Sequence, residues 1–92
     1  MSTKIYVPTP LRSYAGHENV VEVEAATVGG ALRALVERHA ELRRHLYDEG
    51  GRLRRFVNVY RNDEDVRVLD GLDTTVADSD TVVILPAMAG GR

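Results

Sequence analysis

Residues 81–86 read TVVILP, and this short run decides the fold. Positions 82–85 are apolar without a break, which is typical of a strand that has no solvent-facing side. Pro86 closes the run, because proline cannot donate a hydrogen bond to a further rung of a sheet. We therefore expect a central strand that is covered on both faces.

Upstream of this run, further segments have the residue types of strands. Residues 5–7 (Ile-Tyr-Val) are β-branched or aromatic and are followed by a proline. Residues 20–24 alternate apolar and acidic side chains, which predicts a half-buried strand in a hairpin with the first. Residues 56–60 (Phe-Val-Asn-Val-Tyr) predict a third strand. The polar residues 61–65 predict a turn, and residues 66–69 are a candidate edge strand.

The pattern between the second and third strands predicts an amphipathic helix. Thr27 is a suitable N-cap residue, and the pair Gly50-Gly51 is a strong stop signal. The pattern fits either one continuous helix or a long and a short piece that break near Ala40. The apolar stripe recurs at three- and four-residue steps and consists of Leu32, Leu35, Val36, His39, Leu42 and Leu46.

The order of elements is strand, strand, helix, strand, short strand, strand. Such an order predicts an α+β domain with a mixed sheet of four to five strands and one main helix packed on one face. With the last strand placed beside the first, this is the β-grasp arrangement. We expect residues 1–86 to form the β-grasp domain and residues 87–92 to form a flexible C-terminal tail.

Composition excludes several classes of function. The chain has 92 residues and a formal net charge of −2, which argues against a nucleic-acid partner and against an anionic membrane surface. It has no cysteine, so disulfides, thiolate zinc sites and a thiolate nucleophile are excluded. No apolar run has the roughly 20 residues that a membrane span needs, and we expect a cytoplasmic protein.

The last six residues are Ala87-Met88-Ala89-Gly90-Gly91-Arg92. Fully extended, they reach about 20 Å beyond the sheet. Because Gly90 and Gly91 have no Cβ, they can thread a narrow channel and adopt backbone angles that are closed to other residues. An adenylating enzyme needs such a tail to bring a C-terminal carboxylate to the α-phosphate of ATP. For the glycine pair considered alone, a frayed terminus is the competing explanation.

Four segments, none of them specific alone, form a recognisable set. Together they resemble the MoaD/ThiS family of ubiquitin-like sulfur carriers, and within it the CysO type, which carries sulfur for cysteine biosynthesis. The resemblance spans nearly the whole chain. Its segments are Phe56 to Tyr60, Asn62-Asp63-Glu64-Asp65-Val66-Arg67, Ala77 to Asp80, and Ile84-Leu85-Pro86-Ala87-Met88-Ala89-Gly90-Gly91.

The resemblance implies a cycle of chemistry on Gly91. A ubiquitin-activating-type enzyme would adenylate this glycine, and sulfur transfer would give a Gly91 thiocarboxylate. In the CysO type, the thiocarboxylate attacks an activated serine derivative on a PLP-dependent cysteine synthase, and a metal-dependent peptidase cleaves off the cysteine adduct. The carrier needs no cofactor of its own, because the activating enzyme uses the ATP. By position, Gly90 and Ala89 are tail residues, and the partner-binding residues are Leu85, Pro86 and Met88.

Arg92 departs from the family pattern, in which the chain ends on the second glycine. While Arg92 is present, Gly91 has no free carboxylate to adenylate. Three explanations are open: a peptidase trims a precursor, the arginine is a remnant of expression, or the carrier is inactive. We favour trimming, because such pathways already contain a peptidase that cuts after the last glycine of the carrier.

Other functions remain as alternatives. A carrier for molybdopterin, thiamine or tRNA thiolation would share the tail and differ in its partner enzyme. A ubiquitin-like modifier would join Gly91 to protein lysines, and a non-catalytic interaction module would have lost the tail chemistry. A self-contained enzyme fits poorly, since the chain has no nucleophile, metal set or phosphate-binding loop.

The histidines and arginines have simple explanations. His39 lies on the apolar stripe and is expected to be packed and partly buried, whereas His17 lies in a loop and His45 is expected to face solvent. Their spacing does not fit a pair of metal ligands on one helix face. The basic residues form either a solvated face or a docking surface for an acidic partner, and they are Arg43, Arg44, Arg52, Arg54 and Arg55.

Overall fold

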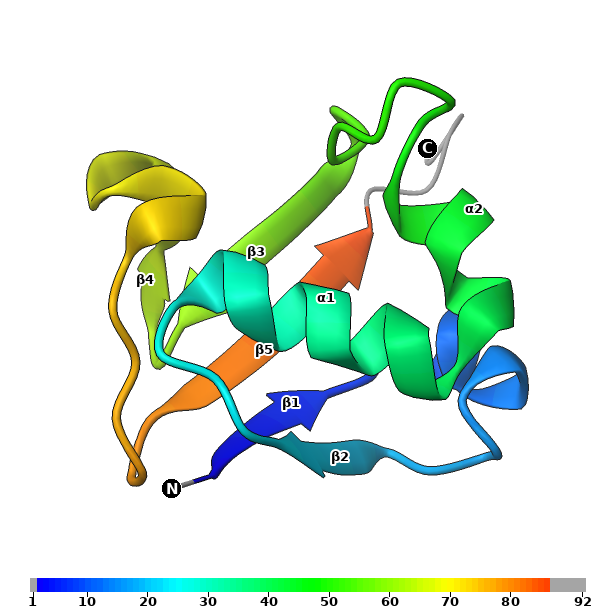
Figure 1. Cartoon of the computed structure of the whole chain (residues 1–92), viewed down its shortest axis with the longest axis horizontal. Coiled ribbons are helices and arrows are strands. Elements are labelled where there is room, and N and C mark those ends of the chain that lie inside the picture. Colours follow the sequence, from blue (N-terminus) through cyan, green and yellow to red (C-terminus); the bar gives the residue numbers. More distant parts are fainter. Residues whose placement is uncertain (1, 87–92) are drawn as a thin grey trace.

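The computed structural model describes residues 2–86 of the chain. Its strands are β1 Thr3–Tyr6, β2 Val20–Val23, β3 Val57–Arg61, β4 Glu64–Asp65 and β5 Thr81–Pro86. They form one mixed sheet in the order β2-β1-β5-β3-β4 (Figure 1). β5 lies at the centre, parallel to β1 and antiparallel to β3. The predicted β-grasp arrangement is confirmed, including the place of the last strand beside the first.

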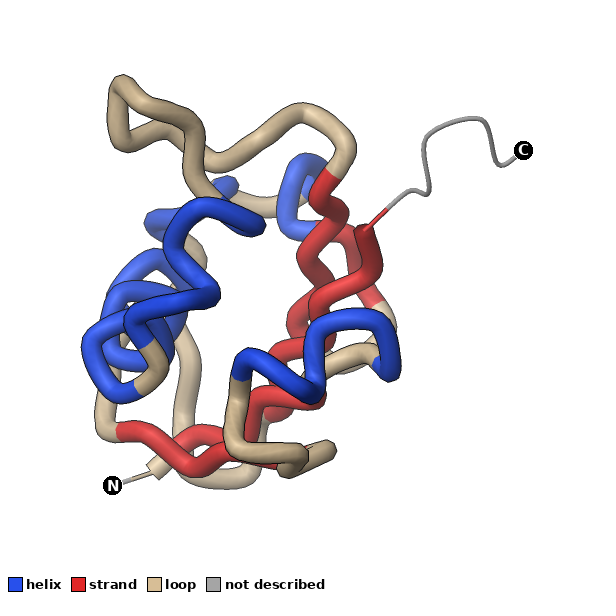
Figure 2. The backbone as a smooth tube through the Cα atoms, turned by 90° about the vertical axis from the view of Figure 1, so that its right-hand side faces the viewer, coloured by secondary structure: helices blue, strands red, loops and turns tan. Residues whose placement is uncertain are grey.

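A helical layer lies on one side of this sheet (Figure 2). Its helices are α1 Val28–Arg38, the 3-10 helix η2 Ala40–Leu42 and α2 Arg43–Leu46. Thr27 caps α1 as predicted, because its Oγ1 accepts a hydrogen bond from the N–H of Gly30 at 3.0 Å. α1 ends at Arg38, because the next residue, His39, has a φ of −128°, which is not helical. Of the two helical patterns that the sequence allowed, the structure therefore has the long and the short piece.

The core lies between α1 and the inner face of the sheet. Leu32 and Leu35 of α1 have no exposed surface, and neither have Ile5 of β1 and Val82 of β5. Ile5 and Val82 are neighbours in the parallel pairing of the two strands. Each such side chain contributes about 1.5–3 kcal/mol through removal of apolar surface from water. The apolar stripe of the sequence is thus the buried face of the helical layer.

The prediction of an edge strand over residues 66–69 is wrong. The edge strand is β4, which pairs with the end of β3, and the chain then turns into the 3-10 helix η3, Val66–Val68. Asp65 explains the turn, because its Oδ1 accepts a hydrogen bond from the backbone N–H of Arg67 at 2.9 Å. A side chain that caps its own backbone in this way competes with the ladder of a sheet.

Two further 3-10 helices complete the fold, η1 Thr9–Tyr14 and η4 Gly71–Asp73. The ring of Tyr14 in η1 stacks on His45 with 4.2 Å between the ring centroids. The prediction that His45 faces solvent is therefore wrong, because the break after α1 turns this histidine toward η1. The prediction for His39 is confirmed, since its side chain is only 18% exposed.

The loop after α2 folds back on itself. Tyr47 and Leu53 form an isolated β-bridge across it. Asp48 closes the loop, because its Oδ1 accepts hydrogen bonds from the N–H groups of Arg52 at 3.0 Å and Gly50 at 2.9 Å. These hydrogen bonds hold the pKa of the Asp48 carboxyl below its usual value. The loop is thus a preformed wall beside α2.

Replacement of Gly51 by alanine is expected to lower the free energy of unfolding by about 1–2 kcal/mol. Gly51 has a φ of +82°, and no atom lies within 4 Å of the place that a Cβ would take, so the cost comes from the backbone alone. Gly50→Ala is the matched control, because Gly50 has no positive φ and its Cβ would lie 3.4 Å from Asp48 Oδ1. Urea unfolding measures both variants, and equal losses would contradict this explanation.

Candidate functional site

The outer face of β5 is exposed, although the sequence predicts that this strand is covered on both faces. Burial alternates along the strand: Val82 and Ile84 are buried, Val83 is half-buried and Leu85 is 46% exposed. The prediction of a doubly covered strand is therefore wrong. Within residues 2–86 the helices α1, η2 and α2 cover one face of the sheet, and the other face of β5 keeps Val83 and Leu85 partly in contact with water.

Apolar side chains of three strands meet on this outer face. The register places Tyr6 of β1 beside Val83 of β5, and Val83 beside Tyr60 of β3. Leu85 follows two residues later on the same face as Val83. We call these four residues the outer row. Tyr6 is 44% exposed, and contiguous exposed apolar groups of this kind mark protein interaction sites.

A polar network borders the outer row. Asn58 of β3 lies beside Leu85 in the register, and its Oδ1 accepts a hydrogen bond from Nη2 of Arg67 at 3.0 Å. The same guanidinium group forms an ion pair with Asp65 at 2.6 Å. Hydrogen bonds from the side chain of Arg67, supported by its backbone N–H, hold the pKa of the Asp65 carboxyl below its usual value. The outer row thus has an apolar centre and a charged rim, as in interfaces between proteins.

The start of β5 is fixed by Asn62. This residue has a φ of +56°, and its Oδ1 accepts a hydrogen bond from the N–H of Thr81 at 3.0 Å. Its Nδ2 donates to Oδ1 of Asp80 at 3.1 Å. This bond and the N–H of Ala77 lower the pKa of the Asp80 carboxyl. The hydrogen bond from Thr81 to Asn62 fixes the register of β5. In this register Pro86, the last residue of the strand, lies opposite Val57 of β3.

The predicted tail lies outside the described residues. Of the predicted partner-binding residues, Leu85 belongs to the outer row and Pro86 is the last residue of β5. Pro86 is described by its backbone only. The remaining candidates stay predictions at this point, and they are Met88, Ala89, Gly90, Gly91 and Arg92.

Comparison with known proteins identifies the kind of domain that carries this strand. The profile of the ThiS family matches residues 5–91, which is nearly the whole chain. The chain belongs to the ThiS family. The match extends through both glycines and stops before Arg92. The resemblance that the motifs indicated is therefore confirmed.

Relatives within and near the ThiS family are small carriers and modifiers. The sulfur carrier protein CysO of Mycobacterium tuberculosis is 42% identical over 93 residues, which covers 99% of this chain and 100% of the relative. The crystal structure of the Amycolatopsis orientalis BexX/CysO complex contains a chain with a TM-score of 0.86 and 46% identity, covering 97% of this chain and 99% of that one. Small archaeal modifier protein 1 of Haloferax volcanii has a TM-score of 0.84 at 30% identity, covering 95% and 98% of the two chains.

The sequence singles out Leu85 through the family resemblance, but it does not show on which face of the sheet Tyr6 and Tyr60 lie. It could not single out Val83, because every position of the strand is apolar and no alternation distinguishes the two faces. The neighbouring strand β1 carries the information about the exposed face instead. In β1 the exposed Lys4 and Tyr6 alternate with the buried Thr3 and Ile5. None of the helices within residues 2–86 is long and apolar enough to cross a membrane.

Proposed function

We propose that this chain is a sulfur carrier that bears its sulfur on Gly91 as a thiocarboxylate. The observation that carries the proposal is the extent of the family match, which includes Gly90 and Gly91 and ends before Arg92. The relatives named as sulfur carriers support the same function. On this proposal the chain is the carried substrate of other enzymes and not a catalyst.

The proposed chemistry begins on the free carboxylate of Gly91, after a peptidase has removed Arg92. A carboxylate oxygen attacks the α-phosphorus of ATP in the activating enzyme, and pyrophosphate leaves. Hydrosulfide then attacks the carbonyl carbon of the acyl adenylate, and AMP leaves. With hydrosulfide the products are the thiocarboxylate, AMP and a proton. Activation is needed because a carboxylate alone is a poor acyl donor.

The outer row is the surface that we assign to the activating enzyme. Burying Tyr6 and Leu85 against a partner would gain about 25 cal/mol for each Å² of apolar surface removed from water. The ion pair of Arg67 and Asp65 at the rim would orient the partner more than it would tighten binding. Because Leu85 lies one residue before Pro86, a partner bound to the outer row would also contact the end of β5, directly before the tail.

Cysteine biosynthesis is the sulfur acceptor pathway that we propose. The thiocarboxylate sulfur would bond to the β-carbon of an activated serine derivative on a PLP-dependent cysteine synthase, and the activating group on the serine oxygen would leave. The resulting thioester would rearrange by an S-to-N acyl shift to an amide between Gly91 and cysteine. A metal-dependent peptidase would then release the amino acid from Gly91. The relatives of the CysO type support this branch. We place the cycle in the cytoplasm, where its ATP is available.

A ubiquitin-like modifier is the second candidate function. The observation that favours it is the similarity to small archaeal modifier proteins. The activated Gly91 carbonyl would then be attacked by a lysine amine instead of a sulfur nucleophile, giving an isopeptide bond. Cells that express the chain would contain a ladder of larger adducts, detectable with an antibody against it.

The intact mass of the untagged protein from its own cells tests the proposed function. We expect a mass that lacks one arginine and has one terminal oxygen exchanged for sulfur. Growth on limiting cysteine should increase this species, because demand for the carrier rises. A chain that keeps Arg92 and gains no sulfur under those conditions would contradict the carrier function and favour an interaction module.

A further inference from the structure

Positive charge gathers in the helical layer and the loop that follows it, in an otherwise acidic chain. Seven of the twelve Lys and Arg residues lie between positions 33 and 55, with only four of the fourteen Asp and Glu residues. The remainder of the chain is therefore clearly net negative. Such an asymmetry produces a local positive field that the overall net charge of −2 conceals.

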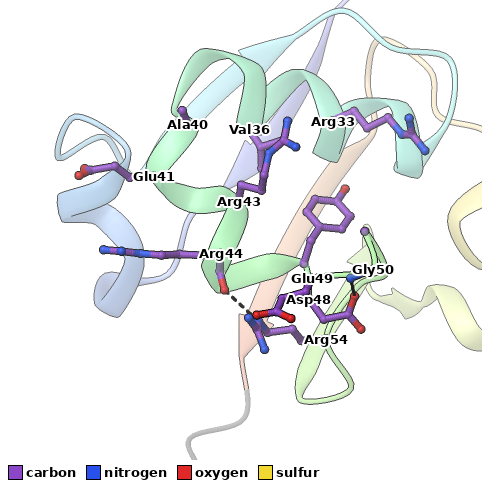
Figure 3. Close-up of a pocket in the computed structure, with 12 residues that line it drawn as sticks. Arg33, Val36, Ala40, Glu41, Arg43, Arg44, Asp48, Glu49, Gly50 and Arg54 are labelled. Atoms are coloured by element: carbon purple, nitrogen blue, oxygen red, sulfur yellow. Dashed lines mark hydrogen bonds between the residues drawn. The ribbon is translucent and has the colours of Figure 1, made fainter.

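Four of these arginines line a cavity of about 850 Å³ beside α2 (Figure 3). Arg33 comes from α1, Arg43 and Arg44 come from α2, and Arg54 follows the loop. Val36 and Ala40 contribute apolar surface, and the loop closed by Asp48 forms one wall. We call this cavity the arginine groove. It belongs to the helical layer and is thus separate from the outer row on the other side of the sheet.

The four arginines of the groove outnumber the three carboxylates of its lining, which belong to Glu41, Asp48 and Glu49. None of the three ion pairs within residues 2–86 involves a groove arginine. Nε of Arg54 donates to the backbone oxygen of Arg44 at 2.9 Å, which orients this side chain and leaves its terminal nitrogens without a partner among the described residues. A guanidinium group held in this way is ready to bind a carboxylate with two parallel hydrogen bonds.

None of the three carboxylates in the lining forms an ion pair with an arginine within residues 2–86. Asp48 accepts hydrogen bonds from backbone N–H groups of its own loop. Glu41 and Arg33 point to opposite sides in the close-up (Figure 3). Glu49 lies on the exposed loop and forms no ion pair within residues 2–86.

Tyr47 adds a hydrogen-bond donor to the arginine groove. Burial raises the pKa of its phenol, and the positive charges of Arg33 and Arg43 offset part of that rise. The phenol therefore keeps its proton at neutral pH and lines the same cavity as Arg33 and Arg43. A hydrogen-bond donor in a cavity that is also lined by arginines is complementary to an anion.

We propose that the arginine groove docks a short acidic segment of a partner protein, whose Asp or Glu side chains bind Arg33 and Arg43. The cavity is far larger than one carboxylate or phosphate group, and it has room for several residues. A long polyanion such as a nucleic acid would extend onto the acidic remainder of the chain, where like charges repel it. Docking needs no chemistry at Gly91, so it stands or falls independently of the carrier function.

The proposal is tested with the full ¹⁵N-labelled chain and a capped oligo-glutamate peptide as the probe. We expect saturable shifts of the amide signals of Arg33, Arg43, Tyr47 and the adjoining loop, which weaken as salt is added. Arg43→Glu and Arg33→Glu are each expected to weaken binding at least about fivefold, since like charges then face each other. Arg55→Glu is the matched control, because Arg55 is exposed and lies outside the groove lining. We expect it to change the affinity less than about twofold, as for a screened surface charge.

Three results would overturn the proposal. If Arg55→Glu weakens binding as much as Arg43→Glu, net charge and not the groove attracts the peptide. If the shifts fall on the outer row instead, the groove is not the site. If tripolyphosphate binds at the same amides at least as tightly as the peptide, the groove is a site for small anions. Unchanged amide signals in β1 and β5 show that each variant is folded.

Discussion

A chain that ends on Gly91 is expected to accept AMP and then sulfur from a matching activating enzyme, whereas the chain that keeps Arg92 accepts neither. In the longer chain the carbonyl of Gly91 is part of a peptide bond, so it offers no carboxylate oxygen to the α-phosphorus of ATP. Arg92 has a carboxylate of its own, but its long side chain would have to enter a channel that suits glycine. We expect the rates to differ at least about a thousandfold, which corresponds to about 4 kcal/mol in the barrier.

Intact mass after incubation with the enzyme, ATP and a sulfide source measures this difference. A chain that ends on Gly90 is the control, because it has a free glycine carboxylate that is placed one residue too early. We expect it to remain near background, which separates the position of Gly91 from the mere presence of a free terminus. Sulfur found on a chain that still contains Arg92 would show that Gly91 is not the reacting residue.

The second large effect is expected for Leu35→Ala, which should lower the free energy of unfolding by about 2–5 kcal/mol. Leu35 is fully buried between α1 and the sheet, and the substitution leaves a cavity that the packed neighbours cannot fill. A domain of this size has a total stability of about 5–15 kcal/mol. The variant is therefore expected to be close to the limit of folding, and urea unfolding measures the loss.

Leu85→Ala makes the same chemical change at an exposed position and serves as the control. Because Leu85 is 46% exposed, its removal is expected to cost less than about 1 kcal/mol of stability. If the outer row binds the activating enzyme, the affinity should fall about tenfold, as for a central contact in an interface. A Leu85 variant that is as unstable as the Leu35 variant, or that binds without loss, would contradict the role of the outer row.

The sequence allowed the layers of the fold to be predicted because its strongest patterns reflect burial. Residues 81–86 could only be a central strand, and the stripe from Leu32 to Leu46 could only be the inner face of a helix. The break after Arg38 was open, since a stripe of apolar residues continues through it. What decides the break is the conformation of His39 and its position beside Gly16 and Glu18, which depends on contacts between distant segments.

The two wrong predictions, of an edge strand and of a doubly covered β5, also have physical causes. Residues 66–69 have the composition of a strand, but the capping by Asp65 turns the chain out of the sheet. The outer face of β5 could not be predicted as exposed, because a strand that is kept apolar for a partner has the same composition as one that is buried within its own chain. In this family member, the place where the prediction of burial fails is the surface that we assign to the activating enzyme.

The position of β5 between two neighbours also bears on mechanical load. A partner that draws on the end of this strand, while the rest of the domain is held, pulls along the strand axis. The rungs to β1 and to β3 are then strained together in shear and do not open one after another as in a zipper. The strand that precedes the tail is thus held by a neighbour on each side, and both ladders must break before β5 can leave the sheet.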